Sequence, residues 1–303
     1  MRTPRTGRGP RRAPAYIREK AAAEGSALSR LKFELAARGL SPRRRFGQNF
    51  LIQEQVAERI VEHCRLHDDD VAVEIGPGAG ALTPRLAARA RRVIAVEKDR
   101  GLAELLREEY GDLARLEIVE ADFLEFDLVA AAAAHDVEKL AVVGNIPYNI
   151  TTPIIERLFE QRRVVSSAVM LVQKEYAARL AAAAGTPEYG SLTLFTRYYA
   201  LLEPLMNVRA SAFWPRPEVD SMLVRFFLRE TPPVEADETL LFRIIRGSFQ
   251  MRRKQLPNTL EQSLGITGEE AERLCRRAGI DPRRRGETLT LDEFARLTRV
   301  AGG

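Results

Sequence analysis

The first residues suited to chemistry follow two apolar runs in the first third of the chain. Val71–Ile75 leads into a turn in which Gly76 and Gly78 allow a sharp bend and the close approach of a ligand to the backbone. Glu97 ends the second run, about twenty residues further on, where its carboxylate can accept hydrogen bonds from both hydroxyls of a ribose. This pair predicts a nucleotide-like ligand. It leaves three interpretations open: a methyltransferase, a dinucleotide-dependent dehydrogenase, or a turn that binds nothing.

Asp122 follows the third apolar run, Leu116–Val119, and favours the methyltransferase. The end of that run is expected at the carboxyl edge of a parallel sheet, where open α/β folds bind ligands. At that edge the carboxylate could accept a hydrogen bond from the exocyclic amine of an adenine. The alternative is that Asp122 only caps the turn into Phe123–Phe126.

The fourth apolar run ends in Asn145-Ile146-Pro147-Tyr148, a combination suited to modifying an aromatic amine. The N6 amine of adenine is a poor nucleophile because its lone pair is delocalised into the ring. The amide oxygen of Asn145 and the backbone carbonyl of Ile146 could each accept one N6–H bond, which favours a pyramidal nitrogen that can attack a sulfonium methyl. Pro147 supplies a rigid turn without a competing donor, and Tyr148 offers a face for stacking an extruded base. Alternatively, this is a polar turn with a tyrosine packed beneath it.

These residues must be held by strands that alternate with helices. Helices are expected at Leu82–Ala90, Leu102–Tyr110 and Pro153–Phe159, and a further strand at Ala168–Val172. Such alternation predicts a parallel sheet with helices on both faces, so that the polar residues at the strand ends meet at one edge. From Ser191 to Phe227 the pattern indicates extended runs broken by prolines.

Basic residues are concentrated at the N-terminus. The N-terminal arm, residues 1–25, is rich in Arg, Pro, Gly and Ala and is predicted to be disordered. Residues 1–45 carry thirteen Lys and Arg against three Glu, which indicates a polyanionic partner. A tail that aids solubility and a mitochondrial transit peptide are the alternatives. A short amphipathic lead-in helix is expected between Ser26 and Gly39.

The pattern becomes purely helical after Thr231-Pro232-Pro233, with helices expected at Leu240–Phe249, Glu269–Ala278 and Leu291–Val300. We therefore place a domain boundary near Glu230–Glu238. Residues 26–232 would form one domain that includes the lead-in helix, and residues 233–303 a small helical domain.

Four motifs in this order carry a resemblance to a known family. They are Gly47-Gln48-Asn49-Phe50-Leu51, Glu74-Ile75-Gly76-Pro77-Gly78-Ala79-Gly80, Asn145-Ile146-Pro147-Tyr148 and Phe249-Gln250-Met251-Arg252-Arg253-Lys254. Over about nine-tenths of its length the chain resembles the KsgA-type small-subunit ribosomal RNA adenine dimethyltransferases. The resemblance implies the α/β class I methyltransferase fold, a Rossmann-like, mostly parallel seven-stranded sheet, with a small all-helical C-terminal domain.

The resemblance also implies an activity and its residues. S-adenosylmethionine would donate methyl groups to N6 of two adjacent adenines in a hairpin near the 3′ end of small-subunit (16S) ribosomal RNA, during ribosome maturation. The residues expected to line the cofactor pocket are Asn49, Leu51, Gly76, Gly78, Glu97, Asp122 and Asn145. Ala212–Ser221 corresponds to the family's loop beside the target base, with Phe213 as a second stacking aromatic opposite Tyr148. The family more often has Phe or Tyr where Trp214 stands, so either ring of the pair could face the base, and both could also belong to the core.

The C-terminal cations distinguish this chain from the large-subunit RNA methyltransferases of the antibiotic-resistance type, which, as the resemblance implies, share the motifs around Asn49 and Asn145. Arg246, Arg252, Arg253 and Lys254 precede Leu256-Pro257-Asn258-Thr259-Leu260, as in the small-subunit enzymes, and are expected to contact RNA phosphates. Arg276, Arg277, Arg283, Arg284 and Arg285 continue this basic lining. The alternatives are a solvated helix face, a large-subunit RNA adenine methyltransferase of the antibiotic-resistance type, and a non-catalytic ribosome-assembly factor with the same fold.

Other classes of protein fit the sequence less well. There is no apolar run long enough to span a membrane, and the N-terminus lacks the apolar core of a secretory signal. Cys64 and Cys275 lie far apart without a partner spacing, which favours a reducing, cytoplasmic compartment. His63, His67 and Asp68–Asp70 offer too few converging ligands for a metal site. We expect a monomer without a metal, whose partner is the small-subunit RNA of the pre-30S particle.

Overall fold

The computed structural model describes residues 26–43 and 47–303, so the N-terminal arm predicted to be disordered lies outside the described residues. By packing, the chain divides into two compact units. The first contains the described residues up to Ile154 together with Asn207–Ser221, and the second contains Ile155–Met206 and Met222–Gly303. These bounds differ from the domain boundary expected near residues 230–238, which stays a prediction.

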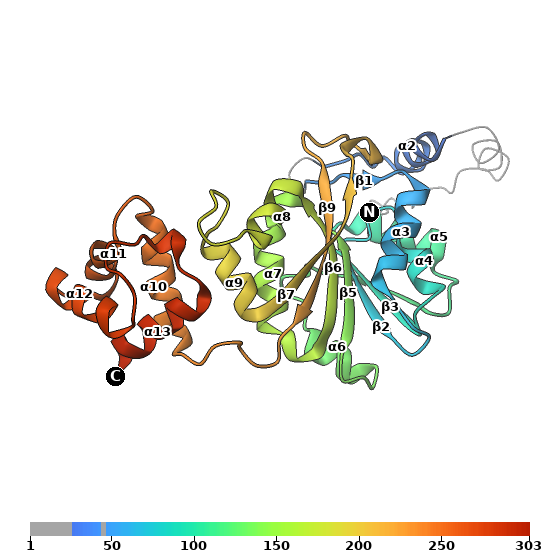
Figure 1. Cartoon of the computed structure of the whole chain (residues 1–303). Coiled ribbons are helices and arrows are strands. Elements are labelled where there is room, and N and C mark those ends of the chain that lie inside the picture. The colour runs from blue at the N-terminus through green and yellow to red at the C-terminus, as the bar shows by residue number, and fades with distance from the viewer. Residues whose placement is uncertain (1–25, 44–46) are drawn as a thin grey trace, which may run out of the picture. The chain divides into compact units, whose positions relative to one another are not determined.

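Seven strands form a mixed, mostly parallel sheet in the order β4-β3-β2-β5-β6-β9-β7 (Figure 1). Strand β2 (Val71–Ile75) pairs in parallel with β3 (Arg92–Glu97) and with β5 (Leu140–Asn145). Strand β3 also pairs in parallel with β4 (Leu116–Glu120). The predicted parallel sheet and the helical C-terminal region are therefore confirmed.

The first unit holds the strands whose ends carry the polar residues. Every side chain of β2 is buried, as expected for a strand with both faces covered. The remaining elements of this unit are α2 (Ala27–Ala37), β1 (Phe50–Leu51), α3 (Glu54–Cys64), α4 (Thr83–Ala87), α5 (Arg100–Tyr110), α6 (Leu128–Ala134), η2 (Tyr148–Ile150), η4 (Ala210–Ala212) and β8 (Phe213–Trp214).

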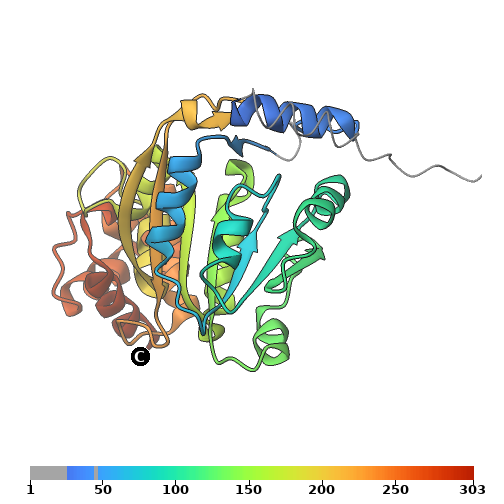
Figure 2. The same ribbon diagram turned by 90° about the vertical axis from the view of Figure 1, so that its right-hand side faces the viewer.

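The lead-in helix α2 is held against α5 by apolar and ionic contacts. Leu31 and Leu35 are buried in a cluster with Phe50 and the α5 leucines. Arg38, which follows the helix, pairs with Glu108 at 2.9 Å and with Glu109 at 2.8 Å. Figure 2 shows α2 lying beside the short strand β1. The predicted lead-in helix is therefore a packed part of the first unit.

The second unit contains the C-terminal helices. Its elements are α7 (Thr151–Glu160, most of which lies here), η3 (Arg162–Val164), β6 (Val165–Gln173), α8 (Lys174–Ala181), α9 (Ser191–Tyr199), β7 (Ala200–Val208), β9 (Ser221–Leu228), α10 (Glu238–Gln250), α11 (Leu256–Leu264), α12 (Gly268–Arg277), η5 (Gly286–Thr288) and α13 (Leu291–Gly302). The three C-terminal helices expected from the sequence are present, and α11 is an additional one.

The expected extended conformation from Ser191 onward is wrong for residues 191–199, which form helix α9. This segment is rich in Thr, Phe and Tyr, residues that favour strands. In the structure its aromatic rings pack against other rings of the same unit: Phe195 and Tyr199 lie 5.4 and 5.2 Å from Phe159, and Tyr198 lies 5.1 Å from Phe242. This tertiary packing outweighs the local preference. Within the described part of the chain, no helix has the length and apolar character needed to cross a membrane.

Candidate active site

The glycine-rich turn after β2 and the end of β3 form one hydrogen-bonded corner. Gly76 and Gly78 have φ angles of +60° and +62°, a backbone conformation that favours glycine. Glu97 accepts the N–H of Gly78 through Oε2 at 3.0 Å and the N–H of Asp99 through Oε1 at 2.8 Å. Burial raises the pKa of Glu97 to about 7. The corner therefore places a buried carboxyl group beside a turn whose backbone a ligand can approach.

A cavity of about 570 Å³ opens at this corner, within the size range of small-molecule sites. Its lining includes all seven residues expected to bind the cofactor: Asn49, Leu51, Gly76, Gly78, Glu97, Asp122 and Asn145. A Cβ atom added at Gly76 would meet no heavy atom within 4 Å, so the space beside this backbone is open. The open backbone, the buried Glu97 carboxyl and the cavity volume fit the adenosine and methionine parts of S-adenosylmethionine.

Asp122 lines the cavity and also caps a turn, so the alternative interpretation as a turn cap describes a real contact and the ligand contact stays a prediction. Its Oδ1 accepts the N–H of Leu124 at 3.1 Å, and its Oδ2 forms an ion pair with Lys98. Burial opposes ionisation of Asp122, but these two contacts outweigh burial and lower its pKa. Asp122 is therefore a carboxylate at neutral pH, able to accept a hydrogen bond from a ligand amine.

Asn145 connects the end of β5 with the segment after the lead-in helix. Its Nδ2 donates to the backbone carbonyl of Asn49 at 3.0 Å, across 96 residues of sequence. The Asn49 side chain donates to the carbonyl of Gly47 at 3.2 Å. This bond uses one of the two N–H groups on the amide nitrogen and fixes the orientation of the amide, whose oxygen is its acceptor.

Ile146, Pro147 and Tyr148 continue along the cavity wall. Ile146 is buried, with 2% of its surface exposed, and its side chain belongs to the core. Tyr148 is half-buried, and its hydroxyl lies 2.7 Å from that of Ser221. The burial of the ring raises the pKa of Tyr148, so the phenol remains protonated at neutral pH.

Phe213 does not line the cavity. The short β8 strand pairs antiparallel with β1, with Leu51 opposite Phe213 and Phe50 opposite Trp214. Phe213 is 2% exposed, whereas the partly buried Trp214 stacks on Phe50 with ring centroids 6.4 Å apart. The cation of Lys32 lies 5.3 Å from the Trp214 ring. A stacking role for Phe213 remains a prediction that needs movement of this strand.

Two residues of this site had no assigned role in the sequence analysis. Phe50 lines the cavity, and a Cβ atom on Gly78 would lie 3.2 Å from its ring. Ser221 is fully buried and contacts Tyr148. Both stand inside motifs that were recognised, Gly47–Leu51 and Ala212–Ser221, but only their three-dimensional contacts reveal what they do.

The C-terminal cations differ in what they contact within the second unit. The Arg252 guanidinium pairs with Glu287 at 3.1 Å and donates to the carbonyl of Pro187 at 3.0 Å. Arg246, Arg253 and Lys254 are exposed, and their side chains have no partner among the described residues. Three of the four residues expected to bind RNA therefore present their charge to solvent. The fourth, Arg252, is partly exposed but forms contacts within the protein.

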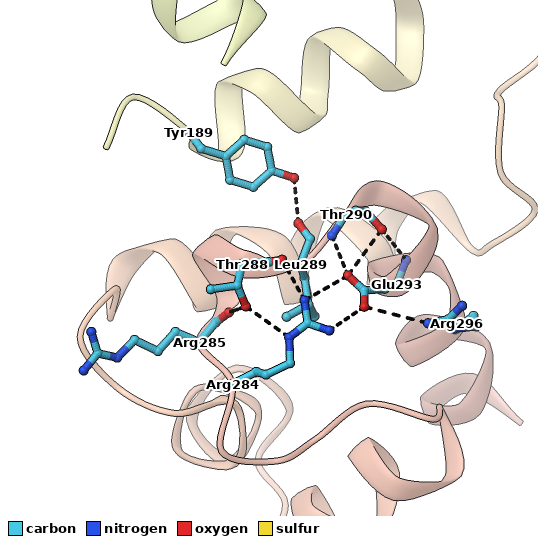
Figure 3. A network of polar contacts seen from close by, with 8 residues as sticks. All are labelled: Tyr189, Arg284, Arg285, Thr288, Leu289, Thr290, Glu293 and Arg296. Atoms are coloured by element: carbon cyan, nitrogen blue, oxygen red, sulfur yellow. Dashed lines mark hydrogen bonds and ion pairs between the residues drawn. The ribbon is translucent and has the colours of Figure 1, made fainter. Parts of the chain in front are cut away.

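The run Arg283–Arg285 is divided in a similar way (Figure 3). Arg284 pairs with Glu293 and donates to the carbonyl of Thr288 at 2.7 Å, whereas the side chain of Arg285 points away from this network. Arg283 pairs with Asp281 at 3.4 Å. The basic run therefore consists of one arginine that stabilises the helical region and two on its surface.

Across residues 26–43 and 47–303, no group of three or more His, Cys, Asp or Glu side chains is arranged to hold a metal ion. His67 and Asp70 instead form a local contact, with Nδ1 and Oδ2 3.4 Å apart.

Residues 39–301 match the family described as "Ribosomal RNA adenine dimethylase". The chain belongs to this family. It is therefore a ribosomal RNA adenine dimethyltransferase that depends on S-adenosylmethionine, and both the predicted activity and the predicted cofactor are confirmed. The family match also excludes the interpretation of the chain as a dinucleotide-dependent dehydrogenase.

Individual relatives in this family cover nearly the whole chain. Proteins named "Ribosomal RNA small subunit methyltransferase A" from Bacillus mycoides (strain KBAB4) and Bacillus cereus (strain AH187) are each 42% identical over 268 residues, which is 86% of this chain and 92% of the relative. The solved 23S rRNA methyltransferase ErmE has 29% identity and a TM-score of 0.64 over 84% of this chain and all of its own. A dimethyladenosine transferase from Plasmodium falciparum, 23% identical over 81% of this chain and 94% of its own, shares the fold with a TM-score of 0.66.

Proposed function

We propose that this enzyme dimethylates N6 of two adjacent adenines in a hairpin near the 3′ end of small-subunit (16S) ribosomal RNA. Its substrate would be the pre-30S particle in the cytoplasm, and the enzyme would act as a monomer. Support comes from 42% identity to small-subunit methyltransferases over 92% of their length. The observation that carries the proposed chemistry is that the Asn49 carbonyl holds the Asn145 amide at the wall of the cavity.

Different residues of the cavity would bind different parts of the S-adenosylmethionine molecule. Glu97 would accept hydrogen bonds from the ribose hydroxyls, and Asp122 one from the adenine amine of the cofactor. Gly76 and Gly78 allow its close approach to the backbone, and Asn49 and Leu51 close the cavity from the lead-in segment. When bound, S-adenosylmethionine supplies an electrophilic methyl group on a sulfonium.

The target adenine would be oriented by the residues after β5. Asn145 Oδ1 and the Ile146 carbonyl accept the two N6–H bonds, which directs the nitrogen lone pair toward the cofactor. Tyr148 stacks on the base, and Phe213 would add a second face once its strand moves. No strong base is needed, because the proton on nitrogen becomes acidic after the methyl group is transferred.

The exposed cations of the C-terminal region would bind RNA phosphates. Arg246, Arg253 and Lys254 present their charge to solvent, and Arg252 stands beside them with its guanidinium in internal contacts. Phosphate contacts position an RNA without reading its sequence. Selection of the small subunit would therefore depend on the shape of the folded particle.

Labelled methyl transfer tests this proposal. Unmethylated small subunits, unmethylated large subunits and naked RNA of each kind are incubated with the enzyme and labelled S-adenosylmethionine, and the modified nucleotides are mapped. We expect two adjacent dimethylated adenines near the 3′ end of the small-subunit RNA. The 29% identity to ErmE favours one rival, a large-subunit methyltransferase. Label confined to large-subunit RNA would establish that rival and overturn the proposal.

A further inference from the structure

Ser221 makes a contact with Tyr148 that the proposed chemistry does not explain. Their hydroxyl groups lie 2.7 Å apart, although the two residues are 73 positions apart in the sequence. Ser221 is fully buried and begins β9, whereas Tyr148 is half-buried, begins η2 and lines the cavity. The hydrogen bond therefore joins the far end of an aromatic ring at the site to a buried serine hydroxyl at the start of β9.

The serine end of this bond is firmly held. The neighbouring Asp220 accepts the backbone N–H of Ala210 through Oδ1 at 2.8 Å, which closes the segment 210–220 on itself. At the tyrosine end the backbone is also held, because the Ile150 N–H donates to the Pro147 carbonyl at 3.2 Å. A ring attached at Cβ can still turn about its two side-chain torsions. A bond at its hydroxyl holds the far end of the ring and so fixes the direction of the ring's long axis.

We propose that Ser221 is a positioning residue for methyl transfer, whose hydroxyl fixes the direction of the long axis of the Tyr148 ring on which the target adenine stacks. This inference rests on the proposed function. A stacked base takes the plane of the ring beneath it, so a tilted ring would tilt the adenine. The N6 nitrogen would then move away from the acceptors at Asn145 and Ile146. Misplacement of about 1 Å is enough to slow an aligned reaction strongly.

A purely structural role would have different consequences. Ser221 could simply satisfy a buried hydroxyl, because polar groups in a core need a partner. Removing it would then lower stability, but the chemical step would continue unchanged in the folded fraction. The two roles are separated by the dependence of the effect on Tyr148.

A double-mutant cycle provides the test. Ser221→Ala, Tyr148→Phe and the double variant are assayed in single turnovers with unmethylated small subunits, at saturating RNA and S-adenosylmethionine. Tyr148→Phe keeps the stacking face and loses only the hydroxyl, so it removes the same bond from the other end. We expect each single variant to lower the rate about tenfold, and the double variant to be no slower than the slower single one.

Three further measurements accompany the cycle. RNA affinity and S-adenosylhomocysteine affinity should stay within about twofold of wild type, because phosphate contacts dominate RNA binding and the cofactor residues are unchanged. Ser221→Thr, which keeps the hydroxyl, should restore most of the rate. Thr298→Val is the matched control: it removes a buried hydroxyl that donates to the Phe294 carbonyl at 2.8 Å in α13, and its rate should equal that of wild type.

Two results would overturn the inference. One is a Ser221→Ala variant with the wild-type rate, and the other is a double variant whose loss equals the product of the two single losses. If Ser221→Ala does not fold, Tyr148→Phe alone decides, because a wild-type rate in that variant shows that the bond has no kinetic role. Failure of the proposed function gives a different outcome, in which the wild-type enzyme itself transfers no methyl group to small subunits.

Discussion

The side-chain amide of Asn145 donates to the backbone carbonyl of Asn49 at 3.0 Å. This bond joins the end of β5 to the segment between α2 and β1, two motifs that the sequence places 96 residues apart. It fixes the orientation of the amide, because one N–H group of the nitrogen is held and the oxygen, the acceptor of the amide, must point the other way. The lead-in segment therefore contributes to the proposed chemistry as well as to the cofactor cavity.

Replacing Asn145 tests its assignment as the group that polarises the target amine. Asn145→Ala should lower the rate of methyl transfer by about a hundredfold or more at saturating cofactor, the loss typical of removing one preorganised hydrogen-bonding group. RNA binding should remain, because phosphate contacts supply most of it. Single-turnover assays together with filter binding to small subunits measure both quantities. A rate within a few-fold of wild type would remove Asn145 from the mechanism.

The Glu97 carboxyl should make cofactor binding depend on pH near neutrality. Burial raises its pKa to about 7 in the cofactor-free protein, and ribose hydroxyls donate to the ionised form. Affinity for S-adenosylhomocysteine should therefore fall as the pH drops below about 7, by up to roughly tenfold per pH unit, and level off above it. Calorimetric titrations between pH 5.5 and 8.5 measure this. Glu97→Gln should bind more weakly with a flat profile, and an equally steep profile in that variant would assign the titration to another group.

Glu74 should make the protein less stable in alkaline solution. Burial is the main cause that raises its pKa from 4.5 to about 8, and the nearby Glu97 adds to it. The folded state holds this proton more tightly than the unfolded chain, so the stabilisation is complete below pH 4.5 and is lost as the pH rises through 8. Glu74→Gln should therefore gain stability relative to wild type between pH 6 and 9, on the order of 1–3 kcal/mol. Urea unfolding at pH 6 and pH 9 measures the free energy of unfolding of each protein. If Glu74→Gln and wild type differed by the same amount at both pH values, the prediction would be wrong.

Arg252 and Arg253 form a matched pair with different expected effects. Arg253→Ala should weaken binding to small subunits and reduce the slope of log affinity against log salt by about one unit, with little change in stability. Arg252→Ala loses the contacts with Glu287 and the Pro187 carbonyl and should cost about 0.5–1 kcal/mol of stability, because this ion pair is partly exposed. Salt-dependent binding and thermal unfolding distinguish the two. Identical salt slopes for both variants would mean that Arg252 also reaches RNA.

Trp214 should report cofactor binding directly, because it is the single tryptophan in the chain. It stacks on Phe50, whose ring lines the cavity beside Gly78. S-adenosylhomocysteine should therefore shift or quench the intrinsic fluorescence in a saturable way. Phe50→Leu removes the connecting ring and should reduce the amplitude at saturating ligand. An unchanged amplitude in that variant would show that the signal does not pass through Phe50.

The strand ends and the cavity they surround were predictable from local sequence. Buried strands of a parallel sheet require continuous apolar runs, and their carboxyl ends must share one edge. Gly76, Glu97, Asp122 and Asn145 each follow such a run, and all four line one cavity. Helical periodicity likewise revealed α2, α10, α12 and α13 because each has one buried face.

Residue type alone could not decide which side chain of a motif faces the cavity. Phe213 and Trp214 are adjacent aromatics, and the register of β8 against β1 places Trp214 on Phe50 and leaves Phe213 buried. That register depends on a pairing across more than 160 residues, as given by the partners Phe50 and Trp214. A shift of one residue would exchange the two faces, and no local pattern specifies it.

The tertiary structure also separated residues that look identical in the sequence. Arg252 and Arg253 stand side by side, but only Arg252 meets an acceptor from the η5 segment, Glu287. Helix α9 formed against its strand-like composition because distant aromatic residues surround it. Local preferences amount to less than about 1 kcal/mol per residue, so burial against distant partners decides such cases. The sequence by itself therefore determined the sheet, the strand ends and the chemistry they carry, and long-range packing decided which way each side chain turns.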